Sequence, residues 1–452
     1  MLRRKNETII RDFLLHEKRA LLVTGARQTG KTFSVRRVAK EIFEHVVEVN
    51  FIESPEAKAI FANPRNAQEI LLRLSAFSKE PMVPSKTLIF LDEVQECKEI
   101  VTAIKFLVGE GSYRYVMSGS LLGIELKDIR SIPVGYMSVL EMYPLDLEEF
   151  AYAVGIGDDV ILHLQECFQQ TKPVDNFIHQ RMLELMRHYL LVGGMPAVVQ
   201  TYVDTNNVRN IVAAQQDVIN TYKLDISKYA EEKKLQIDEI YELIPAELNA
   251  KNKRFILKGL NEKARFHRYE NDFLWLKDAG VAIPVYNVEE PTLPLLLGKQ
   301  RNLLKLFLND VGLLAAMYGN QIQMRLFSGD ININNGAIYE NFVAQELCAH
   351  GLAVNHSLYY FNSKKQGELD FVIEYENHVL PIEVKSGKDY ARHNALSNVL
   401  SNADYDIPRA FVLCQDNIRT KGNIVYLPIY ITMFLKRQQP DEQTIRFDAS
   451  GL

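Results

Sequence analysis

The apolar positions of the first 150 residues fall into short runs that alternate with segments of helical spacing. The runs lie at residues 21–24, 46–51, 88–91 and 115–117, with a candidate fifth run around 137–142. Short apolar runs bounded by glycine or polar residues predict buried β-strands. Because helical segments lie between them, we expect a parallel α/β sheet covered by helices on both faces.

The pattern changes after this first region. Almost every segment from residue 146 to 249 has helical spacing, with a break at Gly193-Gly194-Met195-Pro196 that is either a hinge or a helix-ending turn. A strand-like run at 281–286 and a loop at 289–294 come next. A helix at 339–350 then precedes strands at 357–362, 369–374, 379–384 and 410–413. We expect four parts: residues 1–150, a helical connector at 151–230, a middle domain at 231–300 and a second α/β domain at 301–452.

Composition narrows the class of protein. The 452 residues are 47% hydrophobic and carry a net charge of −5, so the core is ample and the chain has no overall basic footprint for nucleic acid. The four cysteines lie far apart in the sequence, which argues against a zinc ribbon or a disulfide framework. We see neither a signal peptide nor an apolar stretch of membrane-spanning length. A cytoplasmic protein with no membrane partner is therefore expected.

The strongest chemical signal is a glycine-rich octet that follows the first expected strand. Its residues are Gly25, Ala26, Arg27, Gln28, Thr29, Gly30, Lys31 and Thr32. Glycines allow backbone N–H groups to surround phosphate oxygens, and the following helix adds its positive N-terminal end. Lys31 is placed for the β- and γ-phosphates of ATP, and the Thr32 hydroxyl for Mg²⁺. The octet therefore predicts a nucleotide-binding loop.

Acidic residues end the third expected strand. Asp92 is placed to hold Mg²⁺, and Glu93 is placed to polarise the water that attacks the γ-phosphate. Alone, two acids at a strand end would be solvated caps, but the octet makes the catalytic interpretation the better one. Ser118 ends the neighbouring strand and is a candidate γ-phosphate contact, although serine is also common at strand ends for turn reasons.

A second group of charged residues lies on the strands near the C-terminus. Period-two spacing places Glu383 and Lys385 on one face of a strand, and a hairpin would bring Asp370 beside them. Two carboxylates and a lysine, with Glu340 from the preceding helix, form a candidate Mg²⁺ site with Lys385 as its catalytic cation. An amphipathic strand with a cross-strand salt bridge explains the same spacing equally well.

These motifs together resemble those of prokaryotic AAA-type ATPases that carry an uncharacterised C-terminal region with a restriction-endonuclease-like fold. The resemblance rests on the octet, on Asp92-Glu93, on Ser118-Gly119-Ser120, on residues 144–150, on Gly193-Gly194-Met195-Pro196, and on Asp370 with Glu383-Val384-Lys385. It implies an ATPase domain, a winged-helix-like middle and a nuclease-like end. It assigns the nucleotide site to residues 25–32, Asp92 and Glu93. The nuclease-like site is assigned to Glu340, Asp370, Glu383 and Lys385.

Two features qualify what the resemblance implies. Relatives often have a glycine-arginine pair before the segment at 144–150, whereas Tyr136 follows Gly135 here. Arg130 and Arg114 are the candidates to supply the missing cation. In the middle domain, Lys263, Arg265, His267 and Arg268 could face a DNA groove, but we favour a solvated helical face.

The leading functional hypothesis is an ATPase that couples its nucleotide state to a nucleic-acid-directed nuclease-like domain, with ATP and Mg²⁺ as ligands and DNA as a candidate partner. The alternative is a nucleotide-gated protein-interaction module with weak ATPase activity and an inactive nuclease-like scaffold. In a third hypothesis the protein is chiefly a Mg²⁺-dependent nuclease. The sequence leaves open whether the partner is another protein or a further copy of the chain.

Overall fold

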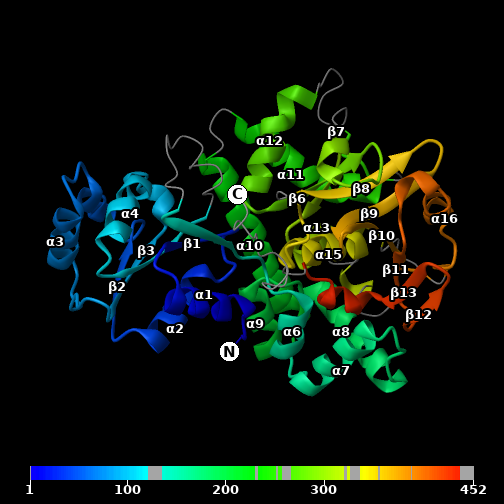
Figure 1. Ribbon diagram of the computed structural model, residues 1–452, viewed down its shortest axis with the longest axis horizontal. Helices are drawn as coiled ribbons and strands as arrows, with labels where there is room; N and C mark the ends of the chain where they lie inside the picture. Colours follow the sequence, from blue (N-terminus) through cyan, green and yellow to red (C-terminus); the bar gives the residue numbers. More distant parts are fainter. Residues whose placement is uncertain are drawn as a thin grey trace, which may run out of the picture. The chain divides into compact units, whose positions relative to one another are not determined.

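The computed structural model describes residues 2–120, 135–229, 233–250, 253–256, 266–319, 323–325, 336–354, 357–387 and 389–437. The chain divides into two compact units (Figure 1). The first contains Met1–Asp158, Arg187–Ile283 and Leu306–Ile333, and the second contains Asp159–Met186, Pro284–Lys305 and Asn334–Leu452. Each unit is built around one β-sheet.

The first sheet has five parallel strands in the order β2-β3-β4-β1-β5. The strands are β1 (Ala20–Thr24), β2 (His45–Asn50), β3 (Thr87–Asp92), β4 (Arg114–Ser118) and β5 (Met137–Glu141). All five coincide with the apolar runs of the sequence, so the predicted parallel α/β sheet is confirmed. In register, Asn50 pairs with Asp92 and Val23 with Ser118, so polar residues gather at the carboxyl edge of the sheet.

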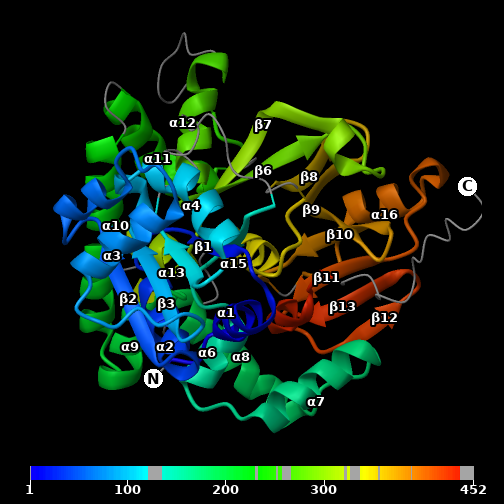
Figure 2. The ribbon, with the colours of Figure 1, turned by 60° about the vertical axis from the view of Figure 1, so that its left-hand side comes forward.

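Helices cover both faces of this sheet (Figure 2). Helices α1 (Lys5–His16) and α2 (Lys31–Ile42) share one apolar core with the sheet, while α3 (Ala67–Phe77) and α4 (Glu99–Glu110) share another. Helical spacing explains the contact: Val35, Val38 and Ala39 are buried on one stripe of α2. The octet therefore joins a buried strand to a helix packed on that strand's own sheet.

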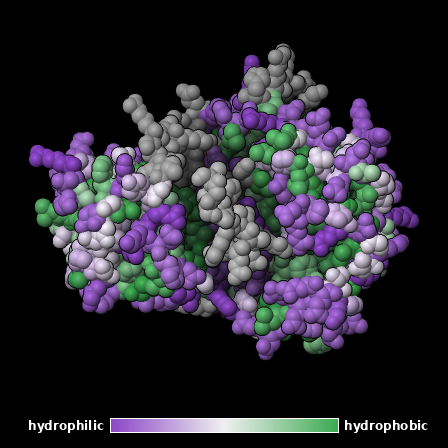
Figure 3. Space-filling view, viewed as in Figure 1, coloured by the Kyte–Doolittle hydropathy of each residue, from purple (hydrophilic) through white to green (hydrophobic). Residues whose placement is uncertain are grey.

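The rest of the first unit is mainly helical, as expected. Its helices include α6 (Leu147–Ala153), α9 (Pro196–Thr205), α10 (Val208–Tyr229), α11 (Lys234–Asn249), α12 (Phe266–Asp278) and α13 (Val311–Met317). Helices α7 (Asp158–Gln169) and α8 (Asn176–Val192) connect the units along the chain, and hydrophilic side chains dominate the visible surface over α7 (Figure 3). No described helix combines the length and apolar character needed to cross a bilayer.

The second sheet has eight strands in the order β12-β13-β11-β10-β9-β8-β6-β7. Its strands are β6 (Ala282–Val288), β7 (Lys299–Leu308), β8 (Leu358–Ser363), β9 (Gly367–Tyr375), β10 (His378–Val384), β11 (Ala410–Cys414), β12 (Arg419–Lys421) and β13 (Ile424–Pro428), with α15 (Gly336–Ala349) and α16 (Asn394–Leu400) beside it. The sequence predicted β6, β8, β9, β10 and β11. It did not predict β7, whose apolar end is interrupted by Lys305.

Candidate functional site

The backbone of the octet is shaped by two glycines with left-handed φ values. Gly25 has a φ of +128°, and a Cβ atom there would lie 2.1 Å from the carbonyl oxygen of Met142. Gly30 has a φ of +92° and directly precedes α2, which starts at Lys31. Only glycine combines these angles with such close packing. The loop therefore presents the first turn of α2 to a ligand.

The side chain of Lys31 is folded into the loop. Its Nζ donates hydrogen bonds to the carbonyl oxygens of Gly25 at 2.9 Å and Ala26 at 2.8 Å. Burial lowers the pKa of Lys31 to about 8, although the nearby carboxylates of Glu93 and Asp92 act in the opposite direction. A lysine held only by backbone carbonyls in a buried site would gain a stronger partner from a phosphate oxygen.

Asp92 is the centre of a buried polar group at the edge of the sheet. The Thr32 hydroxyl donates to its Oδ2 at 3.0 Å and Asn50 Nδ2 donates to the same atom at 3.1 Å, while the Ser118 hydroxyl donates to Oδ1. Burial raises the pKa of Asp92 despite these hydrogen bonds. A hydroxyl beside a carboxylate is a suitable set of hard oxygen ligands for Mg²⁺. Ser118 contacts this carboxylate, and Asn50 is a member that the sequence analysis missed.

Glu93 follows Asp92 in a left-handed conformation, with a φ of 58°. Its Oε2 accepts a hydrogen bond of 2.6 Å from Gln95 Nε2, and its side chain lines the same cavity as the octet. Non-glycine residues in this conformation are often held there at functional sites. The conformation turns Glu93 toward the cavity while Asp92 stays in the sheet.

A cavity of about 750 Å³ opens over the octet. That volume lies within the range for pockets that bind small molecules. Four cationic side chains line it: Arg4, Arg27, Lys31 and Arg36. Its other walls include Phe33 from α2 and Pro196 from the start of α9. The cavity is therefore positively charged where the octet lies, as a polyphosphate ligand requires.

The candidates for the missing arginine are not in this cavity. Arg114 starts β4, four residues before Ser118, so it lies about 13 Å from the carboxyl end of the strand. Arg130 lies outside the described residues. The choice of Arg114 was therefore wrong, because position along a parallel strand decides which edge a side chain reaches. The cavity arginines lie far from residues 114–130 in the sequence, so spacing could not identify them.

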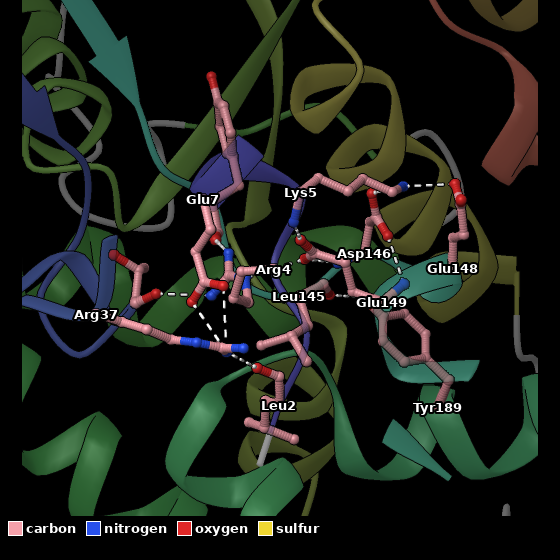
Figure 4. Close-up of polar contacts among 12 residues, drawn as sticks. Leu2, Arg4, Lys5, Glu7, Arg37, Leu145, Asp146, Glu148, Glu149 and Tyr189 are labelled. Atoms are coloured by element: carbon pink, nitrogen blue, oxygen red, sulfur yellow. Dashed lines mark hydrogen bonds and ion pairs between the residues drawn. The ribbon is translucent and has the colours of Figure 1, made fainter. Parts of the chain in front are cut away.

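Arg4 joins the N-terminal segment to the octet (Figure 4). Its guanidinium donates to the carbonyl oxygen of Thr29 at 2.8 Å and to that of Tyr143 at 2.7 Å, and lies 3.2 Å from Glu149 Oε2. Glu149 forms a capping box with Asp146 at the start of α6. The motif at residues 144–150 therefore has a structural role, because it holds the arginine that supports the octet.

Helix α10 contacts the octet through residues on one of its faces. Arg27 Nη1 lies 2.8 Å from Asp225 Oδ1, and Gln28 Nε2 donates to the Thr221 hydroxyl at 3.1 Å. The Tyr222 hydroxyl donates to the carbonyl oxygen of Arg27 at 3.4 Å. Positions 221, 222 and 225 are neighbours on a helix surface. The octet is thus connected to a helix almost 200 residues away in the sequence.

The turn after α12 also approaches the octet. Gly280 has a φ of +73°, and a Cβ atom there would lie 2.9 Å from the backbone nitrogen of Ala26. The glycine therefore allows two backbones to pack against each other. On the same part of the chain, Lys263 and Arg265 lie outside the described residues, as does the side chain of His267, and Arg268 is exposed.

The structure brings the four predicted C-terminal residues into one cluster in the second unit. Asp370 Oδ2 accepts a hydrogen bond of 2.8 Å from the backbone N–H of Val384, and Lys385 Nζ lies 2.6 Å from Glu383 Oε1. Burial raises the pKa of Glu383 to about 8, and the charges of Asp370 and Glu340 act in the same direction. The β9–β10 hairpin thus pairs the strands as the sequence predicted.

Two members of this C-terminal cluster were missed. Lys305 on β7 is fully buried, and its Nζ lies 2.7 Å from Glu368 Oε1, 3.6 Å from Glu340 Oε2 and 4.0 Å from Asp370 Oδ1. Burial acts to lower the pKa of Lys305, but the three carboxylates outweigh it and raise the pKa. A lysine inside the apolar run 303–308 was the available signal. In the described part of the chain, no three His, Cys, Asp or Glu side chains are arranged to hold a metal ion.

Comparison with known proteins separates the chain into three matched regions. Residues 17–151 match the profile of a family described as an AAA domain. Residues 183–323 and 335–432 match two further families, each described as a domain of unknown function (DUF8612 and DUF4143). A search among curated proteins gave no match.

Solved structures of similar fold include ATPases from archaea. The Walker-type ATPase PABY2304 of Pyrococcus abyssi is 12% identical, with 70% of this chain and 96% of that chain covered and a TM-score of 0.40. The ORC1 protein of Aeropyrum pernix, solved with DNA, is 14% identical, with coverages of 73% and 93% and a TM-score of 0.30. The family match and the geometry of the octet, Asp92 and Glu93 together identify residues 17–151 as an AAA-type P-loop ATPase domain.

Proposed function

We propose that the protein is an ATP-hydrolysing switch in which the octet reports its nucleotide state to helix α10. The observation that carries this proposal is the set of contacts from Thr221, Tyr222 and Asp225 to Arg27 and Gln28. Polyphosphate in the cavity would compete with Asp225 for the guanidinium of Arg27. A ligand that changes this contact shifts the equilibrium of the helix it holds.

The residues have distinct roles in the proposed reaction. Lys31 moves from its carbonyl partners to the β- and γ-phosphates, and Thr32 and Asp92 hold Mg²⁺, which neutralises charge that develops on the phosphate oxygens. Glu93 accepts a proton from water as the water oxygen bonds to the γ-phosphorus. The bond between the γ-phosphorus and the β-phosphate oxygen breaks, which releases ADP and phosphate. Arg27 and Arg36 are the cations available to the departing charge.

The function of the C-terminal domain is the second part of the proposal. We favour a binding scaffold whose position depends on the ATPase, because its charged residues are already paired with one another. A Mg²⁺-dependent nuclease with a restriction-endonuclease-like fold is the second candidate. Asp370, Glu383 and Lys385 lie together on one hairpin, which favours that candidate. Metal-dependent nicking of DNA that disappears in Lys385→Ala would support it.

The first test is phosphate release from ATP with Mg²⁺, with and without DNA. We expect turnover by the wild type and loss of turnover in both Glu93→Gln and Lys31→Ala. Equal rates in wild type and Glu93→Gln would leave only a nucleotide-gated binding module. A higher rate with DNA would support a nucleic-acid-directed C-terminal domain, and an unchanged rate would direct the search to a protein partner.

A further inference from the structure

We infer that the ammonium of Lys305 fills the cation position of the C-terminal cluster, so that Glu340, Glu368 and Asp370 bind an internal lysine instead of a divalent metal ion. The inference concerns the second unit alone. It does not depend on ATP hydrolysis, so its failure would leave the proposed ATPase untouched.

The position of Lys305 is the first observation. It lies on β7, and its side chain has no solvent exposure. The carboxylates around its Nζ come from α15 and β9, at 2.7 Å for Glu368, 3.6 Å for Glu340 and 4.0 Å for Asp370. The ring centroid of Tyr360 on β8 lies 5.0 Å from the same atom. One ammonium therefore connects three elements of the sheet domain and its helix.

The carboxylate oxygens around Lys305 are engaged in other contacts as well. Asp370 Oδ2 accepts the backbone N–H of Val384, and Glu368 accepts a hydrogen bond from Asn362. On the neighbouring strand, Glu383 Oε1 is paired with Lys385 at 2.6 Å. A metal ion would have to replace several of these contacts at once. This agrees with the lack of a metal-binding arrangement among the described residues.

Charge and size give the physical reason. Magnesium requires oxygen ligands at about 2.0–2.1 Å in near-octahedral geometry. An ion ligated by Glu340 and Asp370 would lie next to Lys305 Nζ, where two positive charges repel strongly in a buried site. An ammonium satisfies the carboxylates without this requirement, because its three donors reach separate acceptors.

Removal of the ammonium should reverse the preference. In Lys305→Met the carboxylates of Glu340, Glu368 and Asp370 would be buried without a cation, which is unfavourable. They are hard oxygen ligands, the class that binds Mg²⁺ and Mn²⁺. We therefore expect this variant to gain a divalent-cation site that the wild type does not have.

The experiment measures Mn²⁺ binding by electron paramagnetic resonance and thermal unfolding, both without nucleotide. It compares the wild type, Lys305→Met and Asp370→Asn. The matched control is Lys299→Met, which removes another lysine from β7. Expected results are no Asp370-dependent Mn²⁺ site in wild type or control, and one new site in Lys305→Met. In that variant, Mn²⁺ at about 100 times its Kd should raise Tm by roughly 5 °C or more.

Two results would overturn the inference. One is a Mn²⁺ site in the wild type that is lost in Asp370→Asn and kept in Lys299→Met. The other is a folded Lys305→Met variant that binds no Mn²⁺ at all. If Lys305→Met folds only when Mn²⁺ is present, the inference is supported. If it folds under neither condition, the comparison of wild type with Asp370→Asn decides by itself.

Discussion

The guanidinium of Arg27 lies 2.8 Å from the carboxylate of Asp225, so a single ion pair joins the phosphate-binding octet to helix α10. The pair is mostly buried, with side-chain exposures of 25% and 8%. Burial raises the pKa of Asp225, while the charge of Arg27 lowers it. The carboxylate therefore depends on Arg27 for a partner, and any ligand that attracts Arg27 acts on α10.

Asp225→Asn should separate nucleotide binding from its effect on α10. We expect tighter ATP binding, because Arg27 is released toward the cavity, and a stability loss of about 1–3 kcal/mol from the broken pair. In wild type, ATP should change hydrogen exchange along α10, and in the variant this change should be much smaller. Asp217→Asn, on an exposed position of the same helix, is the control. An equal ATP response in all three proteins would contradict the switch.

The roles of Lys31 and Glu93 predict different defects. Lys31→Ala should weaken ATP binding and abolish turnover, because no other side chain replaces its contact with the phosphates. Glu93→Gln should still bind ATP but hydrolyse it about 10²–10⁴-fold more slowly, as expected for loss of a general base. Isothermal titration and phosphate release measure the two effects. Glu53→Gln, an exposed acid after β2, should behave as wild type.

Arg4 should be essential although it precedes every recognised motif. Arg4 and Glu149 have side-chain exposures of only 4% and 5%. Loss of one partner leaves a buried charge, so Arg4→Ala should lower the free energy of unfolding by about 3–5 kcal/mol and weaken ATP binding through Thr29. Urea unfolding of both single variants and the double variant gives the coupling energy. Arg3→Ala removes an exposed pair with Asp158, and a similar loss there would refute the argument.

Gly280→Ala tests the close approach to the octet. Both Gly280 and Gly155 have left-handed φ values, but only at Gly280 would a Cβ atom meet a backbone, 2.9 Å from Ala26 N. Gly155 has open space around it. Both alanine variants should lose about 1 kcal/mol for the φ angle. Only Gly280→Ala should also weaken ATP binding, and equal ATP affinities in the two variants would show that this contact does not affect the loop.

Asp310 should make stability depend on pH. It accepts backbone N–H groups from Gly194 at 2.6 Å and Leu313 at 3.0 Å, and burial raises its pKa to about 6. Because the folded-state value lies above the ordinary 3.8, its contribution is complete below pH 4 and is lost as pH rises through 6.

Asp310→Asn should remove this dependence. Relative to the variant, the wild type should lose roughly 3 kcal/mol of unfolding free energy between pH 4 and 7. Urea unfolding across this range measures the difference. Asp217→Asn should keep the wild-type profile, and parallel curves for wild type and Asp310→Asn would exclude the assignment.

The sequence by itself determined the features that depend on local pattern. Apolar runs located the five strands of the first sheet, because strand burial is written into consecutive residues. The octet placed Lys31 and Thr32 at the start of α2, since its glycines fix the backbone locally. Asp92 and Glu93 followed from their position at the end of a strand.

Only the tertiary structure decided which distant side chains complete the sites. Arg4 and Asp225 contact the octet across 25 and nearly 200 residues of sequence, and Lys305 reaches Glu340 and Asp370 from a strand that the sequence did not predict. No local spacing encodes such contacts, because they depend on the order of strands in a sheet and on which edge each side chain faces. The C-terminal acids therefore read as a metal site in the sequence, and the fold places a lysine among them.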